Sequence, residues 1–314
     1  MNKLEIMNKL DVKRLWKGFW QVADPRCWVA STVPMLVGAA LSYGTRGRFS
    51  LPWFLLSLVG IYLIETGKNS SNEYVDYKTG VDRNIAPENR TPFSGGKKTI
   101  VQGKLSLNEV LYISIVTFLI ACGIGLIIVL FREPRILWVG LLGVLISIFY
   151  SVPPFKFAYS GLGEFAVGFT FGPLVTLGMY MVMAQELDYR AMIVGMPIGF
   201  LIANVLWINQ YPDYEADKQG NKKNWVVRLG KEKGIKIYIT LFILAYVSLI
   251  LVSVIYRNPF WLLGWISIPL AVKSVKIAQK EYNNIPKLIK ANANTLLIYQ
   301  VTGLAMMVAS FLNG

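Results

Sequence analysis

Histidine is absent from the 314-residue sequence, and cysteine occurs only twice, as Cys27 and Cys122. Without histidine, the usual zinc sites and histidine-based acid–base chemistry or catalytic triads are largely excluded. The two cysteines have no paired spacing, which argues against a disulfide framework or a thiolate metal site. The first 26 residues also lack an apolar core long enough for a signal peptide, so we expect no cleavable signal.

Charged residues are scarce, since they make up 16% of the chain whereas hydrophobic residues make up 54%. This composition is typical of a polytopic membrane protein. The charge is also unbalanced, with 32 Lys and Arg against 18 Asp and Glu, which gives a net charge of +14. In so apolar a chain we attribute the excess to membrane topology, and we expect no nucleic-acid partner.

Nine apolar runs come near the ~20 residues that an α-helix needs to cross a bilayer. They lie near residues 28–44, 51–72, 107–130, 136–153, 161–184, 190–211, 236–256, 259–274 and 293–312. Before them, residues 1–26 mix Lys and Arg with apolar residues, which indicates a basic amphipathic helix on the membrane surface. We therefore expect an all-α protein with a single transmembrane domain over residues 27–314.

The distribution of Lys and Arg predicts the orientation of these runs. If the N-terminus is cytoplasmic, that side of the membrane holds all but six of the 32 basic residues, which is 26. It carries the loops near 73–106, 154–160, 212–235 and 275–292. We expect the two longest loops to cap a cavity on the cytoplasmic side, and the C-terminus to lie on the opposite side.

Two similar motifs stand at the ends of the second and sixth runs, at the start of the two longest loops. Both read Asn-x-Tyr-x-Asp-Tyr, from Asn72 to Tyr77 and from Asn209 to Tyr214, and they are 137 residues apart. Four crossings in that interval predict a parallel repeat, with two four-helix halves, a pseudo-twofold axis along the membrane normal, and a ninth helix. Chance similarity between two membrane-edge helices is the alternative.

Each motif places an Asn and an Asp four residues apart, so on a helix they share one face. Asp76, Asp82, Asp213 and Asp217 offer oxygen ligands without a soft donor, which suits Mg²⁺ and also Mn²⁺. Protein carboxylates usually bind Mg²⁺ together with phosphate oxygens, so two facing carboxylate sets favour a diphosphate ligand. Asn72 and Asn209 would orient the carboxylates or add carbonyl ligands. The simpler interpretation is a pair of solvated helix ends beside a bilayer.

Several other residues are candidates for contact with the diphosphate. The basic ones are Arg83, Arg90, Lys97, Lys98 and Lys222. A Pro- and Gly-rich turn after the fourth run brings Tyr150 and Lys156 to the same membrane edge. Glu164 lies just inside an apolar run, where an isolated charge is costly, so it either forms an ion pair or acts on a substrate. Ordinary topology-setting charges would explain many of these residues equally well.

The two aspartate motifs resemble those of the UbiA superfamily of intramembrane prenyltransferases. The resemblance extends over the whole chain, since the nine apolar runs and the two long loops also match. The Asp76–Asp82 and Asp213–Asp217 motifs look most like the branch that prenylates 1,4-dihydroxy-2-naphthoate in menaquinone synthesis. Ser94-Gly-Gly-Lys-Lys98, Gly161-Leu-Gly-Glu164 and Val227-Arg-Leu-Gly230 look like the same branch. Two departures are Glu73, where the family usually has Asp, and the run Gly220–Asn224, which lacks the usual Thr.

The resemblance implies a prenyl diphosphate held through Mg²⁺, with its tail between helices and a length anywhere from C15 to C40. Loss of diphosphate would give an allylic cation that an aromatic acceptor attacks. The implied catalytic residues are Asp76, Asp213, Asp217, Tyr150 and Lys156. The implied metal ligands are the four aspartates, Asn72, Asn209 and Glu73.

Two other functions stay open at this point. A membrane terpene cyclase of the same superfamily would ionise the diphosphate and let an internal alkene capture the cation, and the altered motifs are compatible with it. A transporter or binding protein would place paired charges near the bilayer midplane, whereas the charges here gather at one membrane edge.

Overall fold

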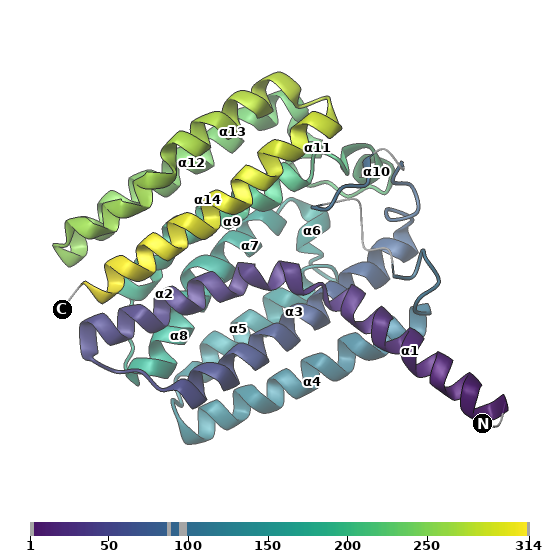
Figure 1. Cartoon of the computed structure of the whole chain (residues 1–314), viewed down its shortest axis with the longest axis horizontal. Coiled ribbons are helices and arrows are strands. Elements are labelled where there is room, and N and C mark those ends of the chain that lie inside the picture. The colour runs from purple at the N-terminus through teal and green to yellow at the C-terminus, as the bar shows by residue number, and fades with distance from the viewer. Residues whose placement is uncertain (1–2, 87–88, 94–98, 313–314) are drawn as a thin grey trace.

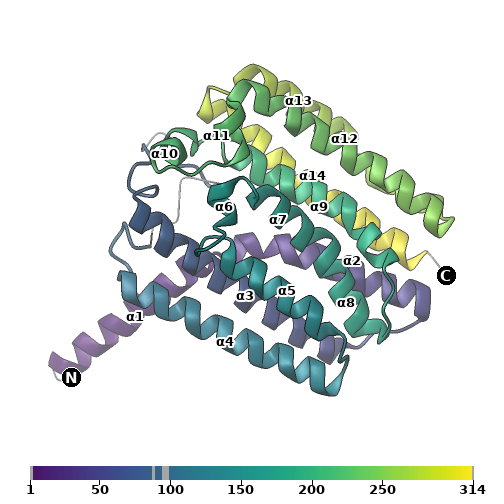
Figure 2. The same cartoon turned by 180° about the vertical axis from the view of Figure 1, so that it is seen from behind.

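The computed structural model describes residues 3–86, 89–93 and 99–312, and their side chains from residue 11 onward. Every regular element in these ranges is a helix (Figures 1 and 2), which confirms the expected all-helical fold. The long helices are α1 (Lys3–Ala23), α2 (Val29–Arg46), α3 (Leu51–Thr79), α4 (Leu107–Phe131), α5 (Ile136–Phe149), α9 (Arg190–Asn209), α12 (Lys231–Tyr256), α13 (Ile268–Glu281) and α14 (Ile285–Phe311). The shorter elements are η1 (Pro25–Trp28), α6 (Phe157–Ser160), α7 (Gly163–Phe169), η3 (Thr170–Leu174), α8 (Val175–Ala184), α10 (Tyr214–Gln219), α11 (Trp225–Leu229) and η4 (Pro259–Ser267).

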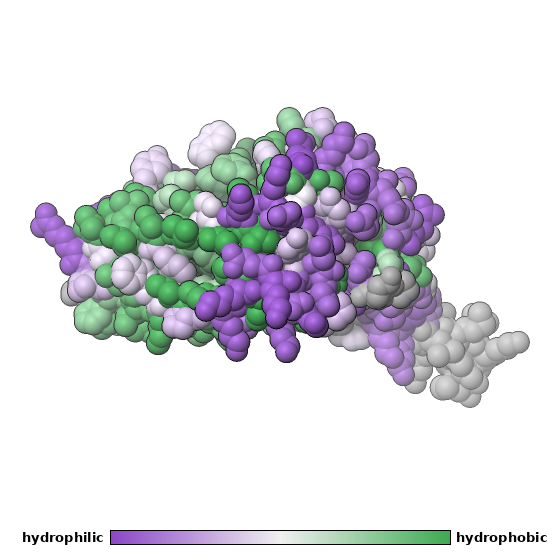
Figure 3. Space-filling view, turned by 90° about the horizontal axis from the view of Figure 1, so that it is seen from above, coloured by the Kyte–Doolittle hydropathy of each residue, from purple (hydrophilic) through white to green (hydrophobic). Residues whose placement is uncertain are grey.

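Seven helical segments of the described chain are long and apolar enough to cross a membrane. α3 is not among them because Glu65 and Lys68 interrupt its apolar run, and α5 is a shorter apolar helix. On the face seen in Figure 3, hydrophilic residues gather over the half nearer to α1, while hydrophobic residues cover most of the other half. The protein is therefore an integral membrane protein with one polar end.

The helices pack closely where small residues face each other, as is common in membrane bundles. The clearest case is the crossing of η3 and α9. A Cβ added to Gly172 would lie 2.5 Å from the Gly199 Cα, so the two backbones can touch only without side chains. η3 is a π-helical turn that contains Pro173, and such turns commonly accompany a local bend in a helix.

Arginines stabilise the end of the bundle away from the polar site. Arg132 donates hydrogen bonds to the carbonyls of Val182 and Met183, at 2.8 and 3.0 Å, and Arg48 donates to the Ala184 carbonyl at 2.6 Å. These carbonyls belong to the last turn of α8, whose final carbonyls have no partner within the helix. Cationic groups at a helix C-terminus also interact favourably with its dipole.

The N-terminal helix α1 extends away from the bundle at the polar end, whereas the C-terminus lies at the opposite end (Figure 1). Helix α1 contacts the bundle through Arg14, which forms an ion pair with Glu109 of α4 at 2.7 Å. Trp16 and Trp20 on α1 are exposed, which suits a helix at the membrane surface. The short helices α6, α10 and α11 lie together at the polar end, where they form part of its cover (Figures 1 and 2).

Candidate active site

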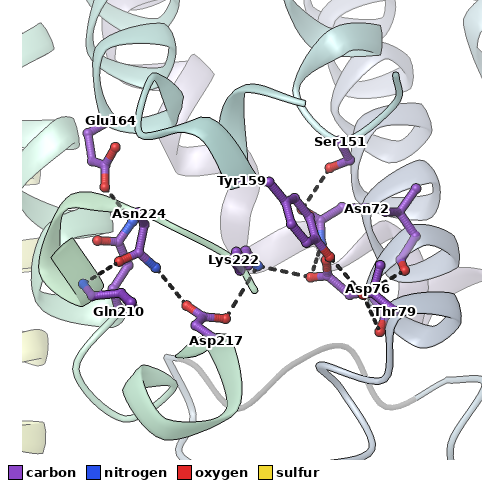
Figure 4. Close-up of polar contacts among 12 residues, drawn as sticks. Asn72, Asp76, Thr79, Ser151, Tyr159, Glu164, Gln210, Asp217, Lys222 and Asn224 are labelled. Atoms are coloured by element: carbon purple, nitrogen blue, oxygen red, sulfur yellow. Dashed lines mark hydrogen bonds and ion pairs between the residues drawn. The ribbon is translucent and has the colours of Figure 1, made fainter. Parts of the chain in front are cut away.

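The first motif lies within a continuous helix, because α3 extends to Thr79. Asn72 and Asp76 therefore share a face, and the Asn72 amide donates to Asp76 Oδ2 at 2.6 Å. Ser151 donates to Asn72 Oδ1 at 3.1 Å, and the Tyr159 hydroxyl donates to Asp76 Oδ1 at 2.5 Å (Figure 4). Asn72 and Tyr159 thus bind the Asp76 carboxylate directly, and Ser151 orients Asn72. Burial and the nearby Asp76 charge raise the pKa of Tyr159 above its usual range, which keeps it a hydrogen-bond donor.

The second motif lies at a break between helices. α9 ends at Asn209, and Asp213 stands at the start of the short helix α10, which carries Asp217. The Asn224 amide donates to Asp217 Oδ2 at 2.7 Å, and the Asn224 carbonyl oxygen accepts from the Val227 amide at the start of α11. Asn224 ends the run Gly220–Asn224, and its amide orients one of the predicted carboxylates.

Lys222 joins the two motifs. Its ammonium donates to Asp76 Oδ2 at 3.1 Å and lies 3.7 Å from Asp217 Oδ1 (Figure 4). The attraction of Asp217 and Asp76 holds the pKa of Lys222 well above its usual value, although burial opposes it. For Asp217, burial raises the pKa to about 6, and the charge of Lys222 opposes that rise. The sequence predicted Lys222 as a contact to diphosphate, but it did not predict this bridge.

Asp82, the last aspartate of the first motif, is buried just after α3. Both of its carboxylate oxygens lack a hydrogen-bond partner among the described residues. Burial raises its pKa to about 9, and the charges of Asp76, Glu73 and Asp213 add to the rise while Lys222 opposes it. A buried carboxylate without a partner is costly, so Asp82 is suited to receive a cation or another ligand.

The donor set fits a hard divalent cation, because it consists of carboxylate oxygens and includes the unpartnered oxygens of Asp82. Within the ranges that the structure describes, however, no three acidic, Cys or His side chains converge to form a metal cluster. Instead, the Lys222 ammonium occupies the space between Asp76 and Asp217. A cation bound there would have to share or replace these contacts.

Two predicted ligands have other partners in the structure. Asn209 Oδ1 accepts a hydrogen bond from the Asn292 amide of α14 at 2.7 Å. Since α9 ends at Asn209, this residue does not share with Asp213 the helix face that we had expected. Glu73 is fully buried, and its Oε1 accepts from the Ile100 backbone at 2.8 Å. Both side chains thus support neighbouring elements in the structure, and their roles as metal ligands stay predictions.

Glu164 also has a supporting position. Its Oε1 accepts from the Gln210 amide and from the Trp225 backbone N–H, both at 3.0 Å. It thereby ties α7 to the end of α9 and to the start of α11. The sequence predicts Glu164 either in an ion pair or in contact with a substrate, and it does not predict Gln210, because a glutamine at a helix end carries no recognisable signal.

The predicted basic residues are only partly gathered at the site. Arg83 is exposed, with its guanidinium 5.2 Å from the centre of the Tyr77 ring, and Arg90 makes no described contact with the aspartates. Lys97 and Lys98 lie outside the described residues. Lys156 lies 5.6 Å from the centre of the Tyr159 ring, so it is near the Asp76 cluster.

An apolar cavity begins one turn deeper along α3 than Asn72. Its volume is about 310 Å³, and its walls are formed by α3, α4, α5, η3 and α8. Lys68 and Glu65 of α3 and Thr170 of η3 are polar residues of its lining. The lining also includes Leu126 of α4 and Leu137 and Leu141 of α5, which are exposed on the outside of the bundle. The cavity thus lies one helical turn below Asn72 and extends to lipid-facing residues of α4 and α5.

The comparison with known proteins agrees with this arrangement. Residues 31–296 match the UbiA prenyltransferase family, which is most of the chain. The chain belongs to this family. The UbiA family chain is 26% identical to the 1,4-dihydroxy-2-naphthoate octaprenyltransferase of Bacillus subtilis, over 82% of this chain and 80% of the relative. It is 28% identical to the 2-carboxy-1,4-naphthoquinone phytyltransferase of Synechocystis, with coverage of 84% and 82%.

A solved structure supports the fold of the UbiA chain. A UbiA homologue from Archaeoglobus fulgidus, bound to GPP and Mg²⁺, superimposes with a TM-score of 0.64 and 18% sequence identity. The match covers 93% of this chain and 99% of that one. The resemblance inferred from the two aspartate motifs is therefore confirmed at the level of family and fold.

Proposed function

We propose that this UbiA family protein transfers a prenyl group from its diphosphate to an aromatic acceptor of the naphthoate class. The observation that carries the proposal is a single face of α3 that holds residues of the acidic site and, one turn deeper, a residue of the apolar cavity. Asp76, Asn72 and Lys68 lie four residues apart on one face of α3, and Lys68 lines the cavity. A diphosphate at the aspartates would thus direct its isoprenoid tail between the helices. The names of the curated relatives support the acceptor class.

Asp76, Asp82, Asp213 and Asp217 would hold Mg²⁺, and Mn²⁺ would suit the same oxygen donors. Bound there, the cation would neutralise charge on the diphosphate and make it a better leaving group. The solved relative that contains GPP and Mg²⁺ supports this choice of cofactor.

The chain's own residues would then act in defined ways. Lys222 would turn from the aspartates to the diphosphate and donate hydrogen bonds as negative charge develops on it. Tyr159 and Asn72 hold Asp76 in place, and Lys156 adds positive charge nearby. The C1–O bond breaks with its electron pair on the diphosphate, and a ring carbon of the acceptor donates a pair to C1. The ring then releases a proton or carbon dioxide, while the apolar walls exclude water.

We further propose that the chain crosses the membrane nine times, as a single domain of two related halves and a ninth helix. α3 and α5 would be the crossings whose composition or length is least typical. The polar end, with α1 and the covering loops, would face the cytoplasm, as the Lys and Arg distribution predicts.

The activity can be tested with the purified protein in detergent. It should be incubated with Mg²⁺ and geranylgeranyl diphosphate, with and without 1,4-dihydroxy-2-naphthoate, while diphosphate and organic products are measured. We expect diphosphate release that depends on the acceptor, Mg²⁺ and a prenylated product. Acceptor-independent release with a cyclised product would instead identify a terpene cyclase.

A further inference from the structure

Lys68 has an unusual environment for a charged residue. Its ammonium lies 5.7 Å from the centre of the Tyr150 ring and 5.4 Å from the centre of the Phe171 ring. Among the residues that the structure describes, none accepts a hydrogen bond from it, although the side chain lines the apolar cavity. A charged group among apolar residues inside a membrane protein costs free energy, so such residues commonly have a function.

A second polar group lines the same cavity without a partner. The Thr170 hydroxyl is buried and has no hydrogen-bond partner in the described part of the chain. Thr170 directly precedes Phe171, whose ring contacts the Lys68 ammonium. The carboxylate of Glu65, which also lines the cavity, accepts a hydrogen bond from the Ser31 hydroxyl. The Lys68 ammonium and the Thr170 hydroxyl, on neighbouring walls of this mostly apolar cavity, are suited to an anionic group of a bound ligand.

We propose that Lys68 binds the carboxylate of the aromatic acceptor and so makes the enzyme selective for aromatic acids. The inference rests on the proposed function, and it identifies the acceptor class through its charge. Lys68 lies eight residues before Asp76 on α3, which is about 12 Å deeper along the helix axis. The diphosphate belongs at the level of the aspartates and Lys222, so the anion nearest to Lys68 comes from the acceptor.

Electrostatics favours the same assignment. Positive charge develops at the donor C1 during ionisation, and an uncompensated ammonium nearby would oppose it in a low-dielectric cavity. A carboxylate paired with Lys68 removes that repulsion. It also holds the acceptor ring beside Tyr150 and Phe171, where it can meet C1.

The test compares two acceptors that differ only in the carboxylate, 1,4-dihydroxy-2-naphthoate and 1,4-naphthalenediol, kept reduced under anaerobic conditions. Their binding to the wild-type protein in lipid nanodiscs is measured by calorimetry without a donor. Lys68→Met removes the ammonium, Lys68→Arg retains a positive charge, and Lys78→Met is the matched control. Lys78 is an exposed residue of the same helix whose ammonium lies 4.6 Å from the centre of the Tyr74 ring.

We expect the wild type to bind the acid at least about tenfold more tightly than the diol, as one charged hydrogen bond would provide. Lys68→Met should lose this preference, while Lys68→Arg retains part of it and Lys78→Met all of it. The KM for the donor should stay the same. Equal wild-type affinities would overturn the proposal even if Lys68→Met does not fold. So would a preference unchanged in Lys68→Met, or a loss confined to the donor, which would assign Lys68 to the diphosphate.

These outcomes are separable from failure of the proposed function. Binding of the acid is measured without turnover, so it reports on Lys68 even if the protein releases no diphosphate. Conversely, acceptor-dependent turnover with no preference for the acid would support the prenyltransferase and reject the role of Lys68.

Discussion

The Lys222 ammonium lies 3.1 Å from Asp76 Oδ2, although the two residues are 146 positions apart in the chain. The same ammonium lies 3.7 Å from Asp217, so a single positive charge joins the two aspartate motifs. It balances carboxylates that would otherwise repel each other in a buried site. The arrangement suggests that Lys222 and a divalent cation compete for the same oxygens.

The first prediction concerns this competition. Lys222→Met should raise Mg²⁺ affinity in the absence of a donor, because the carboxylates lose their internal counter-ion. It should weaken donor binding by about tenfold or more, since one charged hydrogen bond to the diphosphate is lost. Calorimetry with Mg²⁺ alone, and then with donor at saturating Mg²⁺, measures both effects. Lys223→Met, an exposed neighbour, is the control, and lower Mg²⁺ affinity in Lys222→Met would contradict the idea.

The second prediction concerns proton release at Asp82. Because its pKa is raised to about 9, Asp82 is mostly protonated at pH 7. A cation binds the deprotonated carboxylate, so Mg²⁺ binding should release a proton, and apparent affinity should rise between pH 7 and 9. Calorimetry in buffers of different ionisation enthalpy reports the proton. Asp82→Asn should abolish the release, and an undiminished release in this variant would assign the proton to another group.

The same raised pKa has a consequence for stability without metal. The pKa of Asp82 is about 9 in the folded protein, whereas a pKa of about 3.9 is expected in the unfolded chain. The stability that Asp82 contributes is therefore fully present below about pH 3.9 and is lost as the pH rises to about 9. Thermal stability of the metal-free protein should therefore fall over this range. In Asp82→Asn the fall should be smaller.

The third prediction tests the cavity as the site of the tail. Gly125 and Gly123 both lie on α4, and a Cβ added to either would meet no atom within 4 Å, but only Gly125 lines the cavity. Gly125→Leu should lower kcat/KM about tenfold or more for a C20 donor and much less for a C10 donor, since it fills space that the longer tail needs. Gly123→Leu should leave both unchanged. An equal loss with both donors would remove the tail from this cavity.

The fourth prediction addresses stability far from the site. Arg132→Met leaves the Val182 and Met183 carbonyls without their donor, so we expect a loss of about 2–3 kcal/mol in the free energy of unfolding. The apparent melting temperature in detergent should fall accordingly. Arg257→Met, at an exposed helix end, should have little effect. Similar melting temperatures for both variants would show that the α8 carbonyls gain little from Arg132.

The sequence predicted side-chain neighbours correctly where the geometry of a single helix determines them. Asn72 and Asp76 are four residues apart in an unbroken helix, and their side chains are hydrogen-bonded as expected. The same reasoning was wrong for Asn209, because α9 ends there and the equivalent Asp213 begins another helix. An identical spacing has a different meaning when the helix is interrupted, and the Pro212 between them is the only local sign.

Contacts made by the loops were beyond sequence reasoning. The bridge by Lys222 depends on how the segment after α10 folds back over α3, which no periodicity encodes. The roles of Glu73 and Glu164 depend on backbone N–H groups at Ile100 and Trp225 that only the tertiary fold supplies. All-helical architecture, by contrast, follows from the long apolar runs themselves.

The position of the cavity opening, among exposed leucines of α4 and α5, has a kinetic consequence. A hydrophobic donor would enter, and the product would leave, through this opening directly from and to the lipid bilayer. Their effective concentration is then a mole fraction in the bilayer, and added inert lipid or detergent lowers the rate at constant bulk concentration. Reaction rates should therefore follow surface dilution, and donors of different tail length should be compared at equal mole fraction in the membrane.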